Sequence, residues 1–499
     1  MTTIGFEFVR QALELAAIPV RGAAQAGSYT AIHRLPDGTL AVPRHVAPTP
    51  GAPLLKHLLF GLRYEHVELA ILAQALPRLD PAGLLTELRA APAGRFIRLL
   101  CFLYEAFTRT SLDASGVTIA GAYTPLFDPA RHFVGLTRRN TKWRVDYNGL
   151  ADLRYCPVVR RTPEIEAMLG RDVLGQAREF AVEVGPALLD RALTWAYLSE
   201  TESSFEIERD KPDTTKSESF VRLLHQAHAR RPLSEDYLVE LQNSAISNPL
   251  ERAVQFRTLQ NWLHDAAPGA AGVTYVPPPP DLMMELMTAL IEFGNRPPAN
   301  VDPLIVAALS SFGFVLIHPF MDGNGRLSRF LFHHALCMSG QLPDGFLLPV
   351  SIAMKRNEPG YLAALQSFSR PTREFWRVQW AGEADYSFEF KGRAELYRYW
   401  DATSMVEFAL RMAEQSMSTL LREETAYLQA YDKAFKTLDS TLDIRGNSLA
   451  LLLRFCFQSG GRLSNHRRKQ YVDHVSPEAF DMIEATVQQA RIEFGLDRK

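Results

Sequence analysis

Apolar residues recur every three or four positions along most of this chain, which is the period of an amphipathic α-helix. This period predicts helices over residues 54–76, 95–109, 162–174, 186–209, 217–228, 234–246, 248–264 and 394–435. A nearly unbroken apolar stretch predicts another helix, with Asp302 as its N-cap and Pro303 at its first position. A further helix is expected to begin just after Gly325. We therefore predict a mainly α fold.

Three stretches break the helical period. Residues 28–46 place short apolar runs around an Asp-Gly turn, which favours a small hairpin or an irregular segment. Residues 115–163 are rich in glycine, proline and aromatic residues and are expected to form a long surface excursion. Residues 265–281 surround the β-prone run 273–276 with glycine and proline, so a small β-hairpin flap is expected there.

Length, charge and cysteine usage narrow the class of protein. The 499 residues are too many for one compact core, so two or three domains are expected. The formal net charge of -2 gives no general reason to bind nucleic acid or a membrane surface. The four cysteines are widely spaced, which favours reduced thiols over disulfides or a zinc site. Because no apolar run has membrane-spanning length and no signal-peptide pattern is present, we expect a cytoplasmic protein.

One stretch, HPFMDGNGRLSR at residues 318–329, concentrates polar chemistry between two predicted helices. Its Gly-Asn-Gly turn leads into a helix start, where free backbone N–H groups favour an anion. Arg326 and Arg329 are three positions apart, so both can offer forked donors to phosphate. Asp322 suits Mg²⁺ held together with substrate phosphates, and His318 can accept a proton near neutral pH. Together these residues predict phosphoryl or nucleotidyl transfer rather than an ordinary polar loop.

The pattern HPF-x-D-GNGR-x-x-R resembles the signature of the Fic domain family, and this chain matches every specified position. The resemblance covers about residues 200–372. Fic proteins mostly transfer AMP from ATP to a hydroxyl side chain of a protein. The resemblance implies that His318 is the catalytic base, that Asp322 coordinates Mg²⁺, and that Phe320 anchors the loop in the core. The residues implied to bind the nucleotide are Gly323, Asn324, Gly325, Arg326 and Arg329.

The resemblance also gives a role to the β-prone run upstream of the motif. Fic domains carry a flap there that lays the target segment beside the site. By that likeness Thr274, Tyr275 and Val276 would pair with the backbone of a target protein, as a strand adds to an exposed sheet edge. The alternative is a linker stiffened by the prolines that follow.

A second family pattern, Ser/Thr-x-x-x-Glu-Gly/Asn, describes an inhibitory helix, which lies N-terminal to the core in class II members. Ser204 and Glu208 match this pattern, whereas Arg209 stands where the family has Gly or Asn. A carboxylate delivered to Arg329 would occupy the place of the γ-phosphate and leave ATP in a non-productive pose. The alternative is that Glu208 is one of several solvated carboxylates.

We accordingly predict a mostly helical N-terminal domain (1–185), a Fic domain (186–372) and a helical C-terminal domain (373–499). The Fic domain would contain an inhibitory helix at about 195–209 and a catalytic core at about 232–372. The predicted function is an autoinhibited protein adenylyltransferase that uses ATP and Mg²⁺ and modifies a Ser, Thr or Tyr hydroxyl of a protein, with this chain itself as one candidate target. Two alternatives stay open: a Fic enzyme that removes AMP or transfers another nucleotide group, and a nucleotide-sensing regulator with a silenced site. No membrane or nucleic-acid partner is expected. The oligomeric state is left open, with a homodimer as one alternative.

Overall fold

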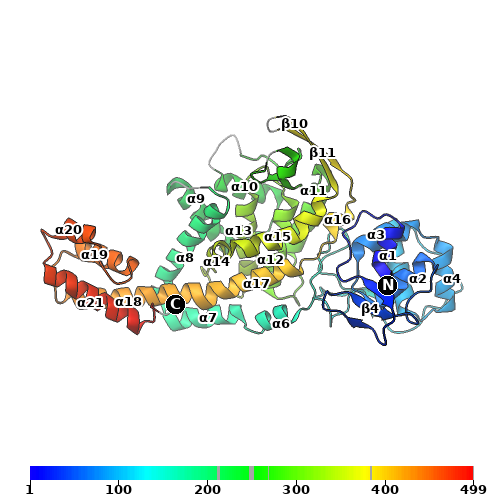
Figure 1. Ribbon diagram of the computed structural model, residues 1–499, viewed down its shortest axis with the longest axis horizontal. Helices are drawn as coiled ribbons and strands as arrows, with labels where there is room; N and C mark the ends of the chain where they lie inside the picture. The colour runs from blue at the N-terminus through cyan, green and yellow to red at the C-terminus, as the bar shows by residue number, and fades with distance from the viewer. Residues whose placement is uncertain (211–213, 247–251, 268, 383–384, 498–499) are drawn as a thin grey trace. The chain divides into compact units, whose positions relative to one another are not determined.

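The structure, a computed structural model, describes residues 1–210, 214–246, 252–267, 269–382 and 385–497. The described residues are mainly α-helical with small sheets, which confirms the predicted fold class (Figure 1). Contacts divide the chain into two units. The first unit comprises Met1–Gly170, Ala229–Met338 and Glu358–Leu410, and the second comprises Arg171–His228, Ser339–Asn357 and Arg411–Lys499. Within the described ranges, no helix is both long and apolar enough to cross a membrane.

The N-terminal part of the first unit packs helices and a small sheet around an apolar core. Its helices are α1 (Gly5–Ala12), α2 (Leu54–Tyr64), α3 (Leu69–Ala75), α4 (Pro81–Ala90) and α5 (Arg95–Thr108). The sheet has the order β1 (Thr2–Thr3), β2 (Ala24–Gly27), β4 (Leu40–Pro43) and β3 (His33–Arg34). Strands β3 and β4 pair antiparallel, which confirms the hairpin expected around the Asp-Gly turn.

The prediction that residues 115–163 form a long surface excursion is wrong in part. The segment forms a sheet with the order β5 (Thr124–Pro125), β7 (Val145–Tyr147) and β6 (Arg138–Asn140). Trp143 is fully buried, and its indole N–H donates to Glu105 Oε2 at 2.7 Å. The buried guanidinium group of Arg98 donates to the Trp143 carbonyl at 3.2 Å. Because both partners belong to α5, tertiary contacts supply the order that the local pattern lacks.

The helix predicted from Pro303 lies at the centre of the rest of the first unit. It is α12 (Pro303–Ile317), in which every residue from Leu304 onward is buried. The Asp302 side chain accepts from the Leu304 N–H at 2.8 Å, which confirms the predicted cap. The other helices in this part of the chain are α6 (Pro163–Leu169), α10 (Glu235–Ala245), α11 (Pro280–Asn295), α13 (Asn324–Ser339), α15 (Glu358–Arg373), α16 (Glu395–Arg398) and α17 (Thr403–Gln415).

The helix predicted at residues 248–264 is wrong over the part that the structure describes. Residues 252–262 form an irregular loop that leads into β8 (Leu263–His264), whereas 247–251 lie outside the described residues. The loop is not helical because buried polar side chains within it bind backbone carbonyl groups of the motif. Strand β8 pairs antiparallel with β9 (Val273–Tyr275), which confirms the predicted hairpin. A second hairpin, β10 (Trp376–Gly382) with β11 (Asp385–Phe390), has no counterpart in the sequence prediction.

The second unit is built from helices. They are α7 (Val173–Val184), α8 (Pro186–Ile207), α9 (Thr214–Gln226), α14 (Val350–Arg356), α18 (Arg422–Asp439), α19 (Gly446–Gln458), α20 (Asn465–Tyr471) and α21 (Pro477–Glu493). Helix α8 packs against α14, where the buried Glu200 carboxylate accepts from the Ser351 N–H at 2.7 Å and from its hydroxyl at 2.6 Å. The C-terminal helices bury an apolar cluster of their own, so the helical C-terminal region is confirmed.

Candidate active site

His318 lies where α12 ends and the motif begins. Its backbone adopts φ 55° and ψ 60°, a left-handed conformation that costs a non-glycine residue about 1–2 kcal/mol. Its Nδ1 lies 3.0 Å from the carbonyl oxygen of Val315. Because a carbonyl can only accept a hydrogen bond, Nδ1 carries the proton and the neutral ring has its basic lone pair on Nε2. The ring is thus held in the tautomer that a general base requires.

Phe320 and Asn324 fix the motif loop, defined here as residues 318–323. Phe320 is 1% exposed and packs against Phe256 and Phe314, which confirms the expected core anchor. The Asn324 side chain accepts from the Phe320 N–H at 3.0 Å and donates to the Phe320 carbonyl at 2.8 Å. The side-chain amide of Asn324 is already bound to the loop. A contact between Asn324 and a nucleotide, as the sequence predicts, would therefore be made by the backbone N–H.

The turn into α13 requires glycine at one position and provides backbone donors. Gly323 has φ +85°, and a Cβ there would lie 3.2 Å from Cδ1 of Ile246. Helix α13 begins at Asn324, so Gly325 lies in its first turn. The N–H groups of a first helical turn have no partner within the helix and form the positive end of its dipole. This turn can therefore bind an anion.

Arg326 and Arg329 are buried, at 5% and 1% exposure. A cation in such a low-dielectric environment attracts phosphate more strongly than it would in water. Arg326 donates to the carbonyl oxygen of Ala245 at 3.2 Å and to Oδ2 of Asp322 at 3.2 Å. The Asp322 side chain itself is 49% exposed. The motif thus combines buried positive charge with one accessible carboxylate.

Asp322 fits the chemistry of a magnesium ligand in a nucleotide site. Among the described residues, no group of three or more His, Cys, Asp or Glu side chains could hold a metal ion. Magnesium in nucleotide enzymes instead takes one or two carboxylates and completes its shell with phosphates and water. A single accessible carboxylate beside the first turn of α13 suits that arrangement.

Two buried residues outside the motif hold the motif loop, and the sequence prediction missed both. Arg257 is 5% exposed, and its guanidinium group donates to the carbonyl oxygens of His318 at 2.9 Å and Pro278 at 2.5 Å. Its backbone N–H donates to Pro319 at 2.8 Å. Asn261 donates to the carbonyl of Phe320 at 2.8 Å.

Burial lowers the pKa of Arg257 to about 10. At neutral pH the group therefore stays charged, and its bonds to carbonyl groups are charge-assisted. If residues 248–264 formed the predicted helix, positions 253, 254, 260 and 261 would be the neighbours of Arg257, and none of them is a carboxylate. The sequence therefore gives this arginine no local ion-pair partner, which was the one available sign that it binds elsewhere in the fold.

The flap contains three predicted target-docking residues, and the structure separates them. The Thr274 side chain is exposed, whereas Tyr275 and Val276 are buried. The Tyr275 hydroxyl donates to the carbonyl of Leu316 at 2.5 Å, and the Val276 carbonyl accepts from the Tyr397 hydroxyl at 2.7 Å. The last two residues therefore anchor β9 to the core, and pairing of this strand with a target stays a prediction.

The predicted inhibitory residues lie at the C-terminal end of α8. Ser204 is fully buried, whereas Glu208 is the C-cap of the helix and is exposed. Arg209 has φ 57°, and the N–H of Asp210 donates back to the carbonyl of Phe205 at 3.0 Å. This is the helix-ending geometry that favours Gly or Asn, the residues of the family pattern. Because Glu208 belongs to the second unit and Arg329 to the first, their pairing stays a prediction.

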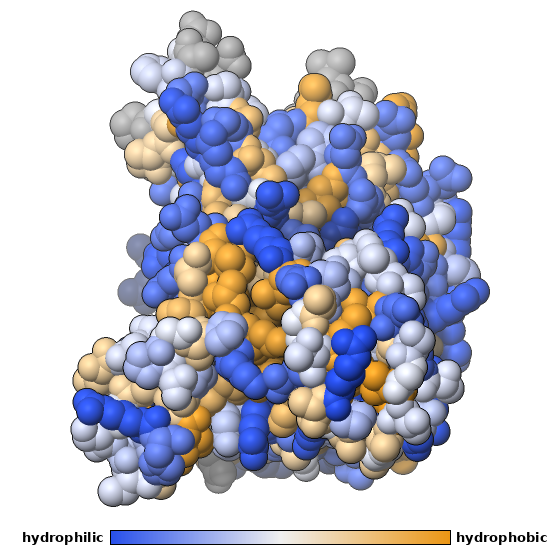
Figure 2. All heavy atoms as spheres, turned by 90° about the vertical axis from the view of Figure 1, so that its right-hand side faces the viewer, coloured by the Kyte–Doolittle hydropathy of each residue, from blue (hydrophilic) through white to orange (hydrophobic). Residues whose placement is uncertain are grey.

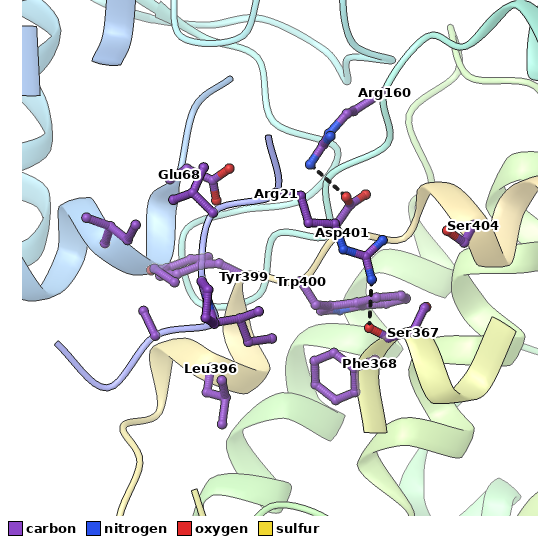
Figure 3. A pocket seen from close by; sticks show the side chains of 16 residues that line it. Arg21, Glu68, Arg160, Ser367, Phe368, Leu396, Tyr399, Trp400, Asp401 and Ser404 are labelled. Carbon is purple, nitrogen blue, oxygen red and sulfur yellow. Dashed lines mark hydrogen bonds and ion pairs between the residues drawn. The ribbon is translucent and has the colours of Figure 1, made fainter. Parts of the chain in front are cut away.

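A small cavity of about 90 Å³ in the first unit is separate from the motif. It is lined by residues 17–21, α3, α15 and residues 396–404 (Figure 3). Arg160 pairs with Asp401 at 2.8 Å, and Arg21 donates to the carbonyl of Ser367 at 3.4 Å. Glu68 also lines the cavity, and burial raises the pKa of its carboxyl group to about 8. No residue of the motif contributes to the lining.

Comparison with known sequences finds a family match that includes the whole motif. The sequence profile of the Fic/DOC family matches residues 232–336. These residues form a Fic domain. The Fic domain includes the whole motif from His318 to Arg329, together with α10, the flap hairpin, α11 and α12.

Two curated relatives are named protein adenylyltransferases. Protein adenylyltransferase fic-1 of Caenorhabditis elegans is 31% identical over 121 residues, which are 24% of this chain and 22% of that protein. Protein adenylyltransferase Fic of Nematostella vectensis is 32% identical over 111 residues, 22% of this chain and 24% of that protein. The chain thus spans less than a quarter of the length of these relatives. Among solved structures, a Fic family protein from Desulfovibrio desulfuricans is 17% identical with a TM-score of 0.39, covering 68% of this chain and 92% of that one.

Proposed function

We propose that the Fic domain of this chain transfers AMP from ATP to a serine, threonine or tyrosine hydroxyl of a protein. The observation that carries the proposal is the 3.0 Å distance between Nδ1 of His318 and the carbonyl oxygen of Val315, from which we infer that Nε2 is the basic atom of the neutral ring. This base precedes α13 in the chain, and the first two turns of α13 bear the buried Arg326 and Arg329. The names of the curated relatives support the same chemistry.

His318 starts the proposed reaction by accepting the proton of the target hydroxyl at Nε2. The hydroxyl oxygen forms a bond to the α-phosphorus of ATP, and the bond between that phosphorus and the bridging oxygen breaks. AMP becomes joined to the target through a phosphodiester, and pyrophosphate leaves. His318 then loses its proton to solvent before the next turnover.

The start of α13 is proposed to hold the phosphates during this transfer. The backbone N–H groups of Gly323, just before the helix, and of Asn324 and Gly325 within it, together with the guanidinium groups of Arg326 and Arg329, offset the negative charge of the triphosphate. Mg²⁺ held by Asp322 would supply further positive charge to the phosphates when it is bound. The protein's own contribution is therefore orientation and charge, with one base.

Glu208 is proposed to restrain this activity. Its carboxylate would form a forked ion pair with Arg329 in the place of the γ-phosphate, so that ATP binds in a non-productive pose. Ser204, which lies four residues earlier and is fully buried, is suited to fixing α8 in place rather than to meeting the nucleotide. Removal of the Glu208 carboxylate should therefore release transfer without altering the base.

Labelling by ATP tests both parts of the proposal. Wild type, Glu208→Gly and His318→Ala are incubated with ATP carrying a labelled adenine, Mg²⁺ and cell lysate, and AMP additions are found by mass spectrometry. We expect strong labelling of the protein itself or of a target with Glu208→Gly, less with wild type and none with His318→Ala. His45→Ala is the matched control, because this exposed histidine lies outside the Fic domain and its loss should leave labelling unchanged.

Two results would overturn the proposal separately. Labelling that survives in His318→Ala would exclude His318 as the base. Equal labelling by wild type and Glu208→Gly would exclude the restraint while leaving the transfer activity in place.

A further inference from the structure

A hollow in the N-terminal part of the first unit lies outside the Fic domain. It is formed by the loop that follows β4, by α2 and by the end of α4 with the start of α5, and its volume is about 510 Å³. Small-molecule sites typically have volumes of roughly 300–1,000 Å³. Figure 2 views the molecule from the side that bears α2 and α4, and hydrophobic side chains gather there in a hollowed region between hydrophilic ones.

The floor of the hollow is apolar and incompletely covered. Val46, Leu59, Tyr64 and Phe96 line it, and each packs on the core beneath while remaining only partly buried. Apolar surface removed from water contributes about 25 cal/mol per Å². A ligand with an apolar body would gain this contribution by covering the floor.

The charges that line the hollow are mostly positive. Lys56 is paired with Glu87, whose two carboxylate oxygens lie 2.9 and 2.8 Å from its Nζ. Arg63 lies over the ring of Tyr64 at 5.2 Å, and Arg95 lies over the ring of Phe96 at 4.9 Å. Neither arginine has an ion-pair partner within the part of the chain that the structure describes. Two exposed guanidinium groups therefore stand beside an apolar floor without a balancing carboxylate.

We propose that this hollow binds a small amphipathic carboxylate. Its apolar chain would cover Leu59 and Phe96, and its carboxylate would pair with the guanidinium groups of Arg63 and Arg95. An extended peptide is a poorer fit, because it needs unpaired backbone groups of a strand edge. The edge strands β1 and β3 of the neighbouring sheet contribute no residue to the lining.

Calorimetric titration of the full chain with decanoate, kept below its micelle concentration, tests the proposal. We expect saturable binding of one molecule per chain. The double variant Arg63→Gln/Arg95→Gln should weaken binding at least about tenfold, since hydrogen bonds to charged groups contribute about 1.5–3 kcal/mol. Decyltrimethylammonium has an alkyl chain of similar length with a positive head and should bind at least about tenfold more weakly than decanoate.

Matched variants separate binding from folding. Both arginines are exposed, so the double variant should keep its thermal unfolding temperature. Arg138→Gln removes an exposed arginine that does not line the hollow, and it should bind decanoate like wild type. Leu59→Asn should weaken binding by making the floor polar.

Four results would overturn the proposal. They are the absence of saturable decanoate binding up to millimolar concentration, equal binding of the cationic analogue, undiminished binding by the double arginine variant, and tighter binding of an acidic, leucine-rich hexapeptide than of decanoate. The last result would replace the small carboxylate by a protein segment as the occupant.

Discussion

The motif loop and the end of α8 share an uncommon backbone conformation but differ in how it is supported. His318 follows α12 with φ 55°, and Arg209 follows the C-cap of α8 with φ 57°. At His318 the ring is bound to the carbonyl of Val315 and the carbonyl accepts from the buried Arg257. Arg209 is exposed at the surface of the second unit, where its N–H donates to the carbonyl of Glu206 at 3.0 Å.

The difference shows what a left-handed residue does in each setting. Strained conformations persist where the surrounding structure over-determines them, and such places are often functional sites. The strain at His318 is enclosed by buried hydrogen bonds, so the proposed base should be held rigidly. The same strain at Arg209 stands at an exposed helix end, so it should weaken the end that carries Glu208. We therefore expect a rigid catalytic loop and an easily released restraint.

Replacement of Arg257 by glutamine should have the largest effect, because it removes the support of the motif loop. The Pro278 carbonyl loses its donor, at a cost of about 1–3 kcal/mol for a buried group, and the His318 carbonyl keeps only the longer bond from Asn261 at 3.4 Å. A displacement of the base by about 1 Å can cost about 100-fold in rate. We expect kcat for labelling in the Glu208→Gly background to fall by about that factor, with a much smaller change in the KM for ATP, measured by steady-state kinetics.

Two further variants make this prediction specific. Arg257→Lys keeps one charged donor and should restore part of the lost kcat, whereas Arg252→Gln, at an exposed arginine in the same segment, should have no effect. An unchanged kcat in Arg257→Gln would mean that the loop keeps its geometry without this support.

Replacement of Arg209 by glycine should have a smaller and opposite consequence, because it relieves the strain at the end of α8. Glycine adopts a left-handed conformation at no steric cost, which should stabilise this helix end by about 1 kcal/mol. A restraint stabilised by that amount should lower basal labelling about fivefold. The change should vanish in the Glu208→Gly background, and increased labelling in Arg209→Gly would contradict the comparison.

Replacement of Glu68 by glutamine should change stability and leave labelling unchanged. Because Glu68 belongs neither to the motif loop nor to the end of α8, this variant serves as a control for the predictions on both. Burial raises the pKa of this carboxyl group from 4.5 to about 8. The folded state then holds the proton more tightly than the unfolded state, so stability falls as pH rises from about 4.5 to about 8. Relative to wild type, Glu68→Gln should gain about 1–3 kcal/mol by pH 8 and nothing near pH 4.

Chemical unfolding of wild type and Glu68→Gln at several pH values between 4 and 9 measures this gain. A constant stability difference across this range would show that the carboxyl group titrates normally in the folded protein.

Local signals were sufficient to predict much of the Fic domain. Asp302 and Pro303 specify the start of α12, and the glycine-rich and proline-rich stretch around the run 273–276 specifies a hairpin. The motif could be recognised because its base, acid, glycine turn and arginines fall within twelve consecutive residues. Each of these features depends on neighbours that are close in the chain.

The features that could not be predicted depend on distant contacts. The loop at residues 252–262 has apolar residues at helical spacing, yet Arg257 and Asn261 bind carbonyl groups about sixty positions away. Trp143 is buried because Glu105 and Arg98 on α5 bind it. Alternation along β9 puts Thr274 and Tyr275 on opposite faces, and the bond between Tyr275 and Leu316 of α12 fixes Tyr275 as the residue that faces the core. Periodicity carries no information about such partners.

The proposed mechanism requires that AMP is transferred by attack on the α-phosphorus of ATP, and the position of a phosphorus label in ATP is the sharpest test of this requirement. Glu208→Gly protein is incubated with Mg²⁺ and with ATP labelled at either the α- or the γ-phosphorus, and the labelled protein residue is identified. We predict that a serine, threonine or tyrosine acquires label from the α-position only, and that Glu208→Gly/His318→Ala acquires none. Label from the γ-position, or α-label that persists without His318, would contradict adenylyl transfer by this site.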